Sequence, residues 1–527
     1  MAYPTTSRVA HDTGYRTGFV WKWLTTTNHK EIGLLYIVTA FTFFFLGGTL
    51  AILMRSELAY PGQQVLGLEL YNRFFSTHGT TMIFLFIIPA LIGFGNYFVP
   101  IMIGASDMAY PRINALGFWM IPPAAILIWS GSPDIGWTGY APLTQVAYSP
   151  GHRVDFWILG LLLVGTSSIL GAINFLVTIF KMRAPGITFS NMPLFVWGIL
   201  VTSAMIVLAT PALASALTML LIDRTLGTCF FVGNQVGQCL AGMDALGNPI
   251  YATADPILWQ HVFWFYSHPA VYIMVLPAMG IISEVLPAMA GKPIFGYKAI
   301  AYSTVAIGFI GFGVWAHHMF TTGMNLELKI PFMLVTVIIA IPSGVKIFNW
   351  TMTLWRGHVL LEAPTLFALG FLGLFVIGGI SGVYNASIPV DYQLQDTYWI
   401  VAHLHYVLFG GSVMGLFSGV YFWYPYMTKR MYNRDLAWIH FILTVIGMNL
   451  TFFTMHYLGL MGMPRRIADY APELGPLNLL ATLGSIILAI GQLPFAYNMI
   501  VSRYTGKVVE RPMLAYQMPP DADAVPR

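Results

Sequence analysis

Apolar stretches long enough to cross a lipid bilayer recur along the chain at intervals of roughly forty residues. The hydropathy pattern distinguishes twelve, centred near Phe43, Ile88, Ala125, Gly165, Ala204, Val275, Ile310, Ile338, Phe375, Gly411, Gly447 and Leu488. Proline and glycine are tolerated within them because neighbouring helices satisfy the freed backbone groups. The pattern predicts an all-α integral membrane protein with a single polytopic domain over 1–527, a twelve-helix bundle at about 30–505 and tails at 1–29 and 506–527.

The composition agrees with a chain that folds in lipid. Hydrophobic residues make up 57% of the 527 residues and charged residues only 9%. The mean hydropathy of +0.70 lies well above that of soluble domains, which excludes a soluble enzyme. The net charge of +4 is small and follows the predicted topology, so no nucleic-acid partner is expected.

Positive charges divide unequally between the two sides of the predicted membrane. With twelve spans both termini fall on one side, which collects seventeen Lys and Arg residues, and the opposite side has seven. Because positive residues concentrate in cytoplasmic loops, both tails are predicted to be cytoplasmic. The first thirty residues are too polar for a cleavable leader, so we expect the first span to start insertion itself.

Two cysteines, Cys229 and Cys239, fall in the long outer loop after the fifth span. An oxidising outer compartment favours a disulfide between them, and two free thiols are the alternative. They lack the partners that a metal site needs.

Six of the thirteen histidines sit in or near segments at membrane depth. They are His78, His268, His317, His318, His403 and His405. Ionisable groups are costly at that depth, so each is a candidate functional residue. A hydrogen-bonded structural histidine between helices is the alternative for any one of them, but it does not explain the arrangement of all six.

The stretch IVAHLHYVLFGG carries His403 and His405 one residue apart. On a helix their side chains point about 200° apart, so they can hardly bind the same metal. His78 could supply the opposite axial ligand to one of two metals. This gives one haem with two histidine ligands and one haem with a single histidine and an open face.

Adjacent His317 and His318 diverge by about 100° on a helix, so they can share a metal only with a third ligand. His268 is the candidate, and three imidazoles with an open position suit copper. Tyr272 follows His268 by four residues and therefore lies on the same helix face, where a phenol can release a proton and an electron together. A core or interfacial tyrosine is the alternative.

The chain resembles subunit I of the haem–copper terminal oxidases, of the cytochrome c oxidase type, over nearly its whole length. The motifs that carry the resemblance are TTNHKEIGLLY, FFSTHGTTMIF, GFGNYFVPIMIGASDMAYPRIN, WFYSHPAVY, VWAHHMFTTGM, IPSGVKIFNW, DTYWIVAHLHYV and GMPRRIADY. The resemblance implies the catalytic subunit of a proton pump that reduces O2 to water in a prokaryotic cytoplasmic (inner) membrane. It also implies a separate subunit II with a CuA or cytochrome c domain, a subunit III, and cytochrome c or a related haem protein as donor.

The resemblance also assigns residues. His78 and His405 would bind the low-spin haem and His403 the high-spin haem, whereas His268, His317 and His318 would bind the copper CuB, with Tyr272 linked covalently to His268. Arg465 and Arg466 resemble the pair that binds haem propionates, and Arg55 resembles the residue that contacts the low-spin haem's formyl group.

Two proton routes follow from the resemblance. The K pathway would run through Ser343 and Lys346 toward Tyr272; a lysine extending its amine to the membrane surface is the alternative. The D pathway would begin at Asp107 and continue along Asn96, Asn114, Ser167 and Ser168.

The chain departs from the commonest pattern at Ala270, where most members of the family have a proton-carrying glutamate. Tyr266 lies one helical turn earlier, and Ser267 adds a second hydroxyl. The string YSHPAVY resembles the bacterial variety in which Tyr-Ser replaces that glutamate and pumping is retained. We therefore expect Tyr266 and Ser267 to take part in the route.

Other departures concern a metal site and the electron donor. Gln395 precedes Asp396 where the family usually has a histidine, which leaves a magnesium site at Asp396 as one interpretation. Leu70 and Arg73 stand where enteric quinol oxidases have a histidine and a glutamine, which favours a haem-protein donor. Glu57 resembles a residue of a peripheral sodium or calcium site, and a surface acid is the alternative. Quinol oxidation, nitric oxide reduction and secondary transport are the competing functions.

Overall fold

The computed structural model describes residues 18–231, 240–243, 245–247, 249–251 and 255–510. Within these ranges twelve helical spans are long and apolar enough to cross a membrane, and each predicted centre falls inside one of them. The spans are His29–Glu57 (α2), Leu68–Ile103 (α3 Leu68–Thr81, η1 Met82–Ile87, α4 Ile88–Ile103), Pro111–Gly131 (α5 Pro111–Trp119, α6 Ile121–Gly131), Arg153–Lys181 (α7), Leu194–Leu226 (α8), Pro256–Ala290 (α9), Tyr297–Met319 (α10 Tyr297–Ile310, η3 Gly311–Gly313, η4 Trp315–Met319), Leu326–Leu354 (α11 Leu326–Ile338, α12 Ala340–Leu354), Ala363–Ala386 (α13), Tyr398–Thr428 (α15 Tyr398–Val407, η5 Leu408–Val413, α16 Met414–Thr428), Arg434–Leu460 (α17 Arg434–Met448, η6 Asn449–Phe453, α18 Thr454–Leu460) and Pro472–Thr505 (η7 Pro472–Leu474, α19 Gly475–Thr505). The predicted twelve-helix fold is confirmed.

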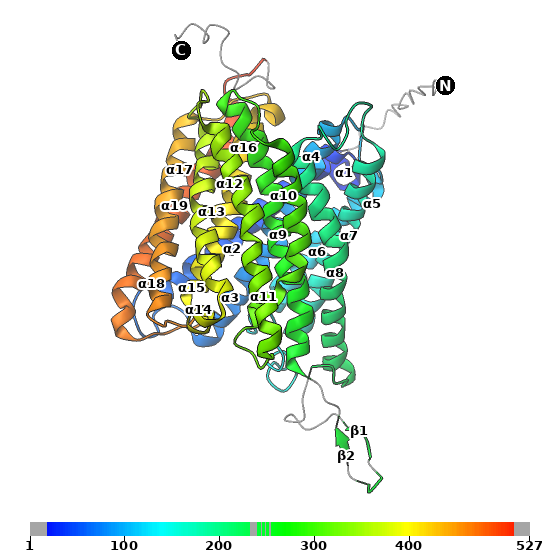
Figure 1. The fold of residues 1–527 in the computed structure, drawn as a ribbon, viewed down its shortest axis with the longest axis vertical. Coiled ribbons are helices and arrows are strands. Elements are labelled where there is room, and N and C mark those ends of the chain that lie inside the picture. Colours follow the sequence, from blue (N-terminus) through cyan, green and yellow to red (C-terminus); the bar gives the residue numbers. More distant parts are fainter. Residues whose placement is uncertain (1–17, 232–239, 244, 248, 252–254, 511–527) are drawn as a thin grey trace.

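The spans stand side by side in one bundle, with the start of α1 (Phe19–Thr25) and the end of α19 at the same end (Figure 1). This agrees with an even number of crossings. At the opposite end a small hairpin of β1 (Leu240–Met243) and β2 (Pro249–Tyr251) projects beyond the helices. The hairpin does not change the all-α fold class, because this loop extends outside the bundle and so escapes the requirement for helical hydrogen bonding in lipid.

The same loop contains the two cysteines. Cys229 is disulfide-bonded, whereas Cys239 lies outside the described residues. The alternative of a free thiol is therefore wrong for Cys229.

Side chains and glycines mark several helix ends. The Asn28 side chain accepts hydrogen bonds from the first-turn amides of α2, and the Asp255 side chain accepts one from the Ile257 amide at the start of α9. Both satisfy donors that the helix itself cannot pair. Gly227 and Gly291 end α8 and α9 in the left-handed conformation, which costs glycine nothing.

Small residues let α8 and α9 approach closely. A Cβ on Gly198 would stand 2.8 Å from the Leu276 carbonyl oxygen, and a Cβ on Gly280 would stand 2.8 Å from the Phe195 Cα. Membrane helices associate through such close backbone contact because lipid gives them no hydrophobic drive to pack. The two antiparallel helices are therefore held in a fixed register.

Three spans contain a π-helical segment, and each segment lies near a candidate haem ligand. The segments are η1 (Met82–Ile87), η5 (Leu408–Val413) and η6 (Asn449–Phe453). The first two begin within about one turn after His78 and His405, and Phe452 of η6 stacks on the His405 ring. Such segments are rare and are frequent at functional sites.

A buried arginine fastens the outer loops to α8. Arg224 forms an ion pair with Asp155 of α7 at 2.5 Å and donates to the carbonyls of Thr144, Ser149 and Gly151. Its side chain is only 1% exposed. We expect Arg224→Met to lower the free energy of unfolding by about 3–5 kcal/mol, because it leaves a buried carboxylate and three carbonyls unpaired.

Thermal unfolding in detergent measures this effect. The control is Arg153→Met, which removes an exposed pair with Glu69 and should cost less than about 1 kcal/mol. Equal losses in the two variants would contradict the structural role of Arg224.

Candidate metal centre

Three histidines converge between α9 and the end of the seventh span. His268 comes from α9, and His317 and His318 come from η4 (Trp315–Met319). Their candidate ligand nitrogens all lie within 4.8 Å of one another, and in the part of the chain that the structure describes they are the one group of three or more His, Cys, Asp or Glu with that geometry. The structure thus brings together the three residues that the sequence grouped.

The two adjacent histidines do not sit on an α-helix as expected. The η4 segment is a 3₁₀ helix, in which neighbouring side chains diverge by about 120° rather than about 100°. The His317 and His318 ring centroids are nonetheless 4.3 Å apart. The tighter turn at the end of the span allows both imidazoles to reach His268.

Contacts around the three rings leave metal-binding nitrogens free. Thr336 donates its hydroxyl proton to the Phe332 carbonyl, so His317 Nδ1, 3.1 Å away, must be the donor in its bond to Thr336 Oγ1. This holds a neutral His317 with its Nε2 lone pair available. His268 faces the group through Nδ1, which lies 3.2 Å from His318 Nε2. Its other nitrogen, Nε2, is buried with no hydrogen-bond partner among the described residues.

Two aromatic residues border this group. The indole of Trp264 stacks on His318 with ring centroids 3.7 Å apart, and its Nε1 donates to the Tyr140 hydroxyl at 2.6 Å. The Tyr272 ring lies edge-on to His268 at 4.7 Å between centroids. The phenol is therefore close to the candidate copper ligands, as its spacing of four residues predicts.

His78 and His405 form a second pair. Their rings are nearly parallel, at 15°, and their centroids are 6.5 Å apart. Metal–imidazole bonds of about 2.0 Å on both sides of one ion bring two ring centroids to roughly 6 Å. Each Nδ1 faces a backbone carbonyl, that of Gly47 for His78 and that of Val401 for His405, so both Nε2 atoms are left as acceptors.

His403 points to the other side of α15. Its Nδ1 lies 2.9 Å from the Gly378 carbonyl oxygen and 3.0 Å from Ser381 Oγ on α13. A Cβ on Gly382 would stand 3.0 Å from the His403 ring, so glycine is required for this fit. His403 and His405 therefore have separate surroundings, as their angular separation predicts.

The three arginines that the resemblance assigned to haem have unpartnered nitrogens or polar neighbours. Arg55 is buried and bonds to Asn478 and Thr482, but its Nε and Nη1 have no partner among the described residues. Arg466 Nη2 is likewise buried and unpaired. Burial also lowers the pKa of Arg466 to about 10. Buried guanidinium groups with unpaired donors fit anionic or carbonyl groups of a bound cofactor.

Arg465 is occupied by a protein partner. It forms an ion pair with Asp396 at 2.5 Å. Gln395 donates to the His318 carbonyl at 3.3 Å. Among the described residues, Asp396 belongs to no group of three candidate metal ligands. At the separate site predicted for sodium or calcium, the Glu57 carboxylate accepts hydrogen bonds from the backbone amides of residues 64–66.

Lys346 is buried in α12. Its amine donates to the Thr304 hydroxyl at 2.5 Å and to the Ile300 carbonyl at 3.1 Å, both on α10. Ser343 donates to Ile339 within its own segment. A lysine with an internal partner at 1% exposure is not one that extends to the membrane surface.

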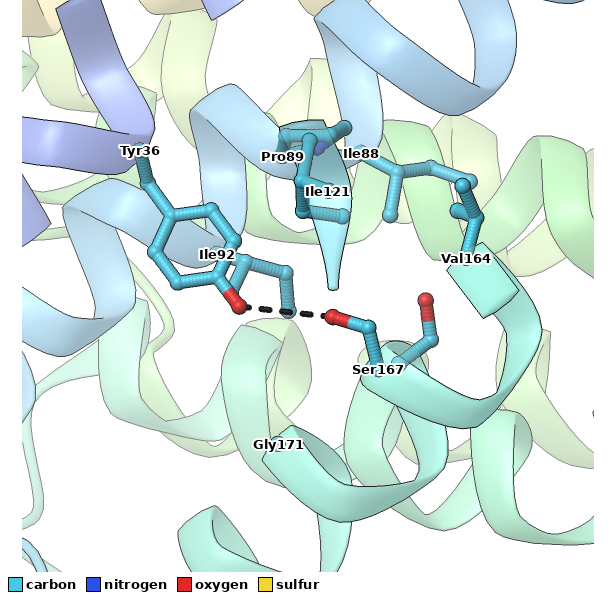
Figure 2. Close-up of a pocket in the computed structure, with 9 residues that line it drawn as sticks. Tyr36, Ile88, Pro89, Ile92, Ile121, Val164, Ser167 and Gly171 are labelled. Carbon is cyan, nitrogen blue, oxygen red and sulfur yellow. Dashed lines mark hydrogen bonds between the residues drawn. The ribbon is translucent and has the colours of Figure 1, made fainter. Parts of the chain in front are cut away.

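The residues predicted for a second proton route lie on α4, α5 and α7, and Tyr36 of α2 lies beside them. Tyr36 Oη lies 3.4 Å from Ser167 Oγ, as Figure 2 shows, and Ser167 donates to the Gly117 carbonyl. Ser167, Ser168 and Tyr36 line one cavity. Asn96 Oδ1 and Asn114 Nδ2 are buried without partners among the described residues, as internal waters would require.

Asp107 lies in the loop between α4 and α5, and its carboxylate accepts a hydrogen bond from the Met108 amide. Nearer the metal centre, Tyr266 stacks on Phe84 at 6.3 Å, and the Ser267 hydroxyl is buried without a described partner. Ala270 is buried on the same side of α9 as Tyr266.

Sequence analysis missed several polar residues at these sites. No sequence pattern pointed to Thr304 or Tyr36 as site residues, because only the fold brings Thr304 to Lys346 and Tyr36 to Ser167. Asp391, in α14 (Ile388–Leu394), could have been found as the acid five residues before Asp396. Both of its carboxylate oxygens are buried without partners among the described residues, and burial raises its pKa to about 8.

Comparison with known proteins agrees with these sites. The family model for cytochrome c and quinol oxidase polypeptide I matches residues 31–487. The chain belongs to that family. It is 53% identical to cytochrome c oxidase subunit 1 of Synechocystis sp., over 92% of this chain and 85% of the relative, and 49% identical to that of Thermostichus vulcanus, over 93% and 87%.

More distant relatives extend the comparison. The cytochrome c oxidase polypeptide 1 of Halobacterium salinarum is 44% identical over 97% of this chain and 85% of the relative. A solved haem–copper terminal oxidase dimer has the same fold, with a TM-score of 0.74 at 20% identity over 92% of this chain and 85% of that one. The recognition of a haem–copper oxidase subunit I is confirmed.

The raised pKa of Asp391 predicts a pH-dependent stability. The folded protein keeps a proton that the unfolded chain releases, so the free energy of unfolding should fall as pH rises from about 5 to 8. In Asp391→Asn this fall should be absent. The melting temperature of the variant should therefore rise relative to that of the parent as pH increases from about 5 to 8.

The control is Asp469→Asn, because amide hydrogen bonds from Gly62 and Tyr470 lower the pKa of Asp469, so it stays ionised throughout. If the melting temperatures of the parent and of Asp391→Asn change with pH in parallel, Asp391 does not hold the proton.

Proposed function

We propose that this chain is the catalytic subunit of a proton-pumping terminal oxidase, which reduces O2 to water with electrons from cytochrome c or a related haem protein. The observation that carries the proposal is the placement of His403 and His405 on opposite sides of α15. His405 faces His78 across a gap that suits one metal ion, and His403 is oriented by a different helix. The three-histidine group and Tyr272 supply a further metal site nearby.

The donor sets fit two haems and one copper. His78 and His405 would hold the low-spin haem, His403 the high-spin haem, and His268, His317 and His318 the copper. When bound, these groups supply the redox chemistry and the site where O2 binds. The chain fixes the tautomer of each imidazole by accepting a hydrogen bond from its Nδ1, and it excludes bulk water by burial.

Tyr272 is proposed to hold the proton that the reaction needs at its phenol oxygen, beside His268. Its ring packs against Gly311, because a Cβ added to Gly311 would stand only 2.9 Å from Cδ2 of the Tyr272 ring. A covalent bond between Tyr272 and His268 would fix this geometry, and the buried, unpartnered His268 Nε2 is consistent with it. Lys346 and Thr304 would deliver protons to Tyr272 from one side.

The second route is proposed to enter at Asp107 and to pass Asn96, Asn114, Ser167 and Ser168 on the way to Tyr266 and Ser267. Unpartnered amide atoms on both asparagines and a cavity lined by three hydroxyls support it. Tyr266 and Ser267 would then replace the carboxylate that Ala270 lacks.

The surroundings of the chain follow from the same proposal. It would assemble with a subunit II that bears CuA or a cytochrome c domain and with a subunit III, in a prokaryotic cytoplasmic membrane with both termini inside. The relatives' names favour cytochrome c over quinol as the electron source. A magnesium ion at Asp396 stays a prediction, because Arg465 already pairs with that carboxylate.

An optical spectrum of the purified complex tests the proposal. Reduction with dithionite should reveal two haems, of which only one binds carbon monoxide, and metal analysis of this subunit should find one copper for every two irons. His317→Ala should lose copper and keep both haems, whereas His78→Ala should lose the low-spin haem first. One haem, no copper, or carbon monoxide bound to neither haem would end the oxidase interpretation.

Turnover in reconstituted vesicles tests the two proton routes. Asp107→Asn should slow oxygen consumption and abolish or uncouple pumping, because its carboxylate starts the longer route. Lys346→Met should block turnover by roughly 10²-fold or more, since proton transfer by a positioned group contributes that much. Unchanged turnover and stoichiometry in Asp107→Asn would remove the D pathway, and a fast Lys346→Met enzyme would remove the K pathway.

A further inference from the structure

The segment that carries two of the proposed copper ligands is a weak helix by itself. The η4 segment is a 3₁₀ helix of five residues. Runs longer than three or four residues are uncommon in this conformation, because its hydrogen-bond geometry is poor. No side chain caps its first turn. The positions of His317 and His318 therefore depend on contacts with neighbouring elements.

A hydrogen bond fixes the start of η4 to α9. The indole Nε1 of Trp315 donates to His261 Nδ1 at 3.3 Å. The Trp315 ring also lies edge-on to Phe265 of α9, at 5.3 Å between centroids, and to Phe332 of α11, at 4.7 Å. Trp315 is thus held between the helix that supplies one candidate copper ligand and the helix that orients another.

The direction of this hydrogen bond fixes the tautomer of His261. An indole N–H can only donate, so His261 Nδ1 must be unprotonated and the ring proton of the neutral imidazole lies on Nε2. His78 and His405 have the opposite tautomer, because their Nδ1 atoms face backbone carbonyls. In the described part of the chain, His261 belongs to no group of three candidate metal ligands. It therefore acts as an acceptor for Trp315 and not as a ligand.

His261 and His268 lie on one face of α9. They are seven residues apart, which is about two helical turns, and Phe265 lies between them on the same face. At the inner of these two positions the His268 ring approaches that of His317, with centroids 4.4 Å apart. The same face of α9 therefore contacts η4 twice, once at the start of the segment and once at the candidate copper ligands.

We propose that His261 is a positioning residue for the copper site. By accepting a hydrogen bond from Trp315, it holds the start of η4 against α9 at a point two residues before His317. A displacement of that point would move His317 and His318 relative to His268, because η4 has little internal hydrogen bonding to resist it. The inference rests on the proposed function, since copper is the metal that the three histidines would hold.

The test uses the intact complex carrying His261→Leu, His261→Asn or Trp315→Phe. Leucine removes the acceptor and phenylalanine removes the donor, whereas the asparagine Oδ1 stands near the position of the histidine Nδ1 and can accept the same hydrogen bond. The C–O stretching band of the reduced complex with carbon monoxide reports the surroundings of the haem ligand beside the copper. Dialysis against a chelator measures the rate of copper loss.

The leucine and phenylalanine variants should shift or broaden the C–O band. They should also lose copper about threefold to tenfold faster and consume O2 about threefold to tenfold more slowly, as expected for the loss of one neutral hydrogen bond. His261→Asn should stay within about twofold of the parent. The double variant of His261→Leu and Trp315→Phe should be no worse than the more affected single variant, because both changes remove the same bond.

Trp197→Phe is the matched control. The Trp197 indole donates to the Tyr297 hydroxyl at 3.1 Å, so this variant loses a similar hydrogen bond between α8 and α10. Both residues lie near the starts of these helices, whereas η4 lies at the far end of the span that α10 begins. The control should keep the C–O band, the rate of copper loss and the turnover of the parent.

The outcomes separate this inference from the proposed function. A parent complex that holds no copper or binds no carbon monoxide overturns both. A parent with copper whose C–O band and copper loss are unchanged in His261→Leu and Trp315→Phe overturns the role of His261 and leaves the oxidase interpretation in place.

Two further results also overturn the role of His261. They are equal losses in His261→Asn and His261→Leu, and additive losses in the double variant, because neither effect would come from the shared hydrogen bond. If His261→Leu does not assemble with haem, the comparison of Trp315→Phe with Trp197→Phe decides, and equal C–O bands in those two variants overturn the proposal.

Discussion

A histidine can bind a metal through one ring nitrogen only when its other nitrogen has a fixed partner, and the metal-binding part of this bundle depends on that condition. Gly47, Val401 and Gly378 present backbone carbonyls to the Nδ1 atoms of His78, His405 and His403. A carbonyl can only accept, so the ring proton of each neutral imidazole sits on Nδ1 and its Nε2 lone pair is free. In lipid, where no water competes, these bonds also fix the plane of each ring. The position of each backbone segment therefore decides where a metal can sit.

The same constraint explains why unpartnered polar atoms are informative here. Most buried polar atoms of the bundle are paired, as membrane depth requires. Among the exceptions are Arg55, Arg466 and His268, which are candidate cofactor ligands, and Asn96 and Asn114, which belong to the proposed proton route. Each is costly to leave unmet. Cofactors at the first group and internal waters at the second would satisfy these atoms.

Much of this fold could be predicted from the sequence because apolarity over spanning length is a local property. The residues His268 and Tyr272 could also be related, because four positions on one helix define a shared face. Thr304 could not, since only the assembled bundle brings it to Lys346. The sequence offered Asp391 as a nearby acid but gave no sign that its carboxylate is buried without a partner among the described residues. The 3₁₀ turn at His317 had no signal either, because its tighter geometry reflects the packing at the end of a span.

In the proposed proton route, Ala270 stands where a carboxylate is expected, and the hydroxyls of Tyr266 and Ser267 take its place. A carboxylate moves a proton by swinging a long side chain, so one residue can cover a large gap. Hydroxyls at Tyr266 and Ser267 are shorter or fixed by packing, as the stacking of Tyr266 on Phe84 illustrates. More hydroxyl groups at fixed positions are then needed to carry a proton over the same distance. The close packing of α8 against α9 keeps the spacing of such hydroxyl groups fixed. In the proposed route, precise packing thus compensates for the absence of a long, flexible acidic side chain.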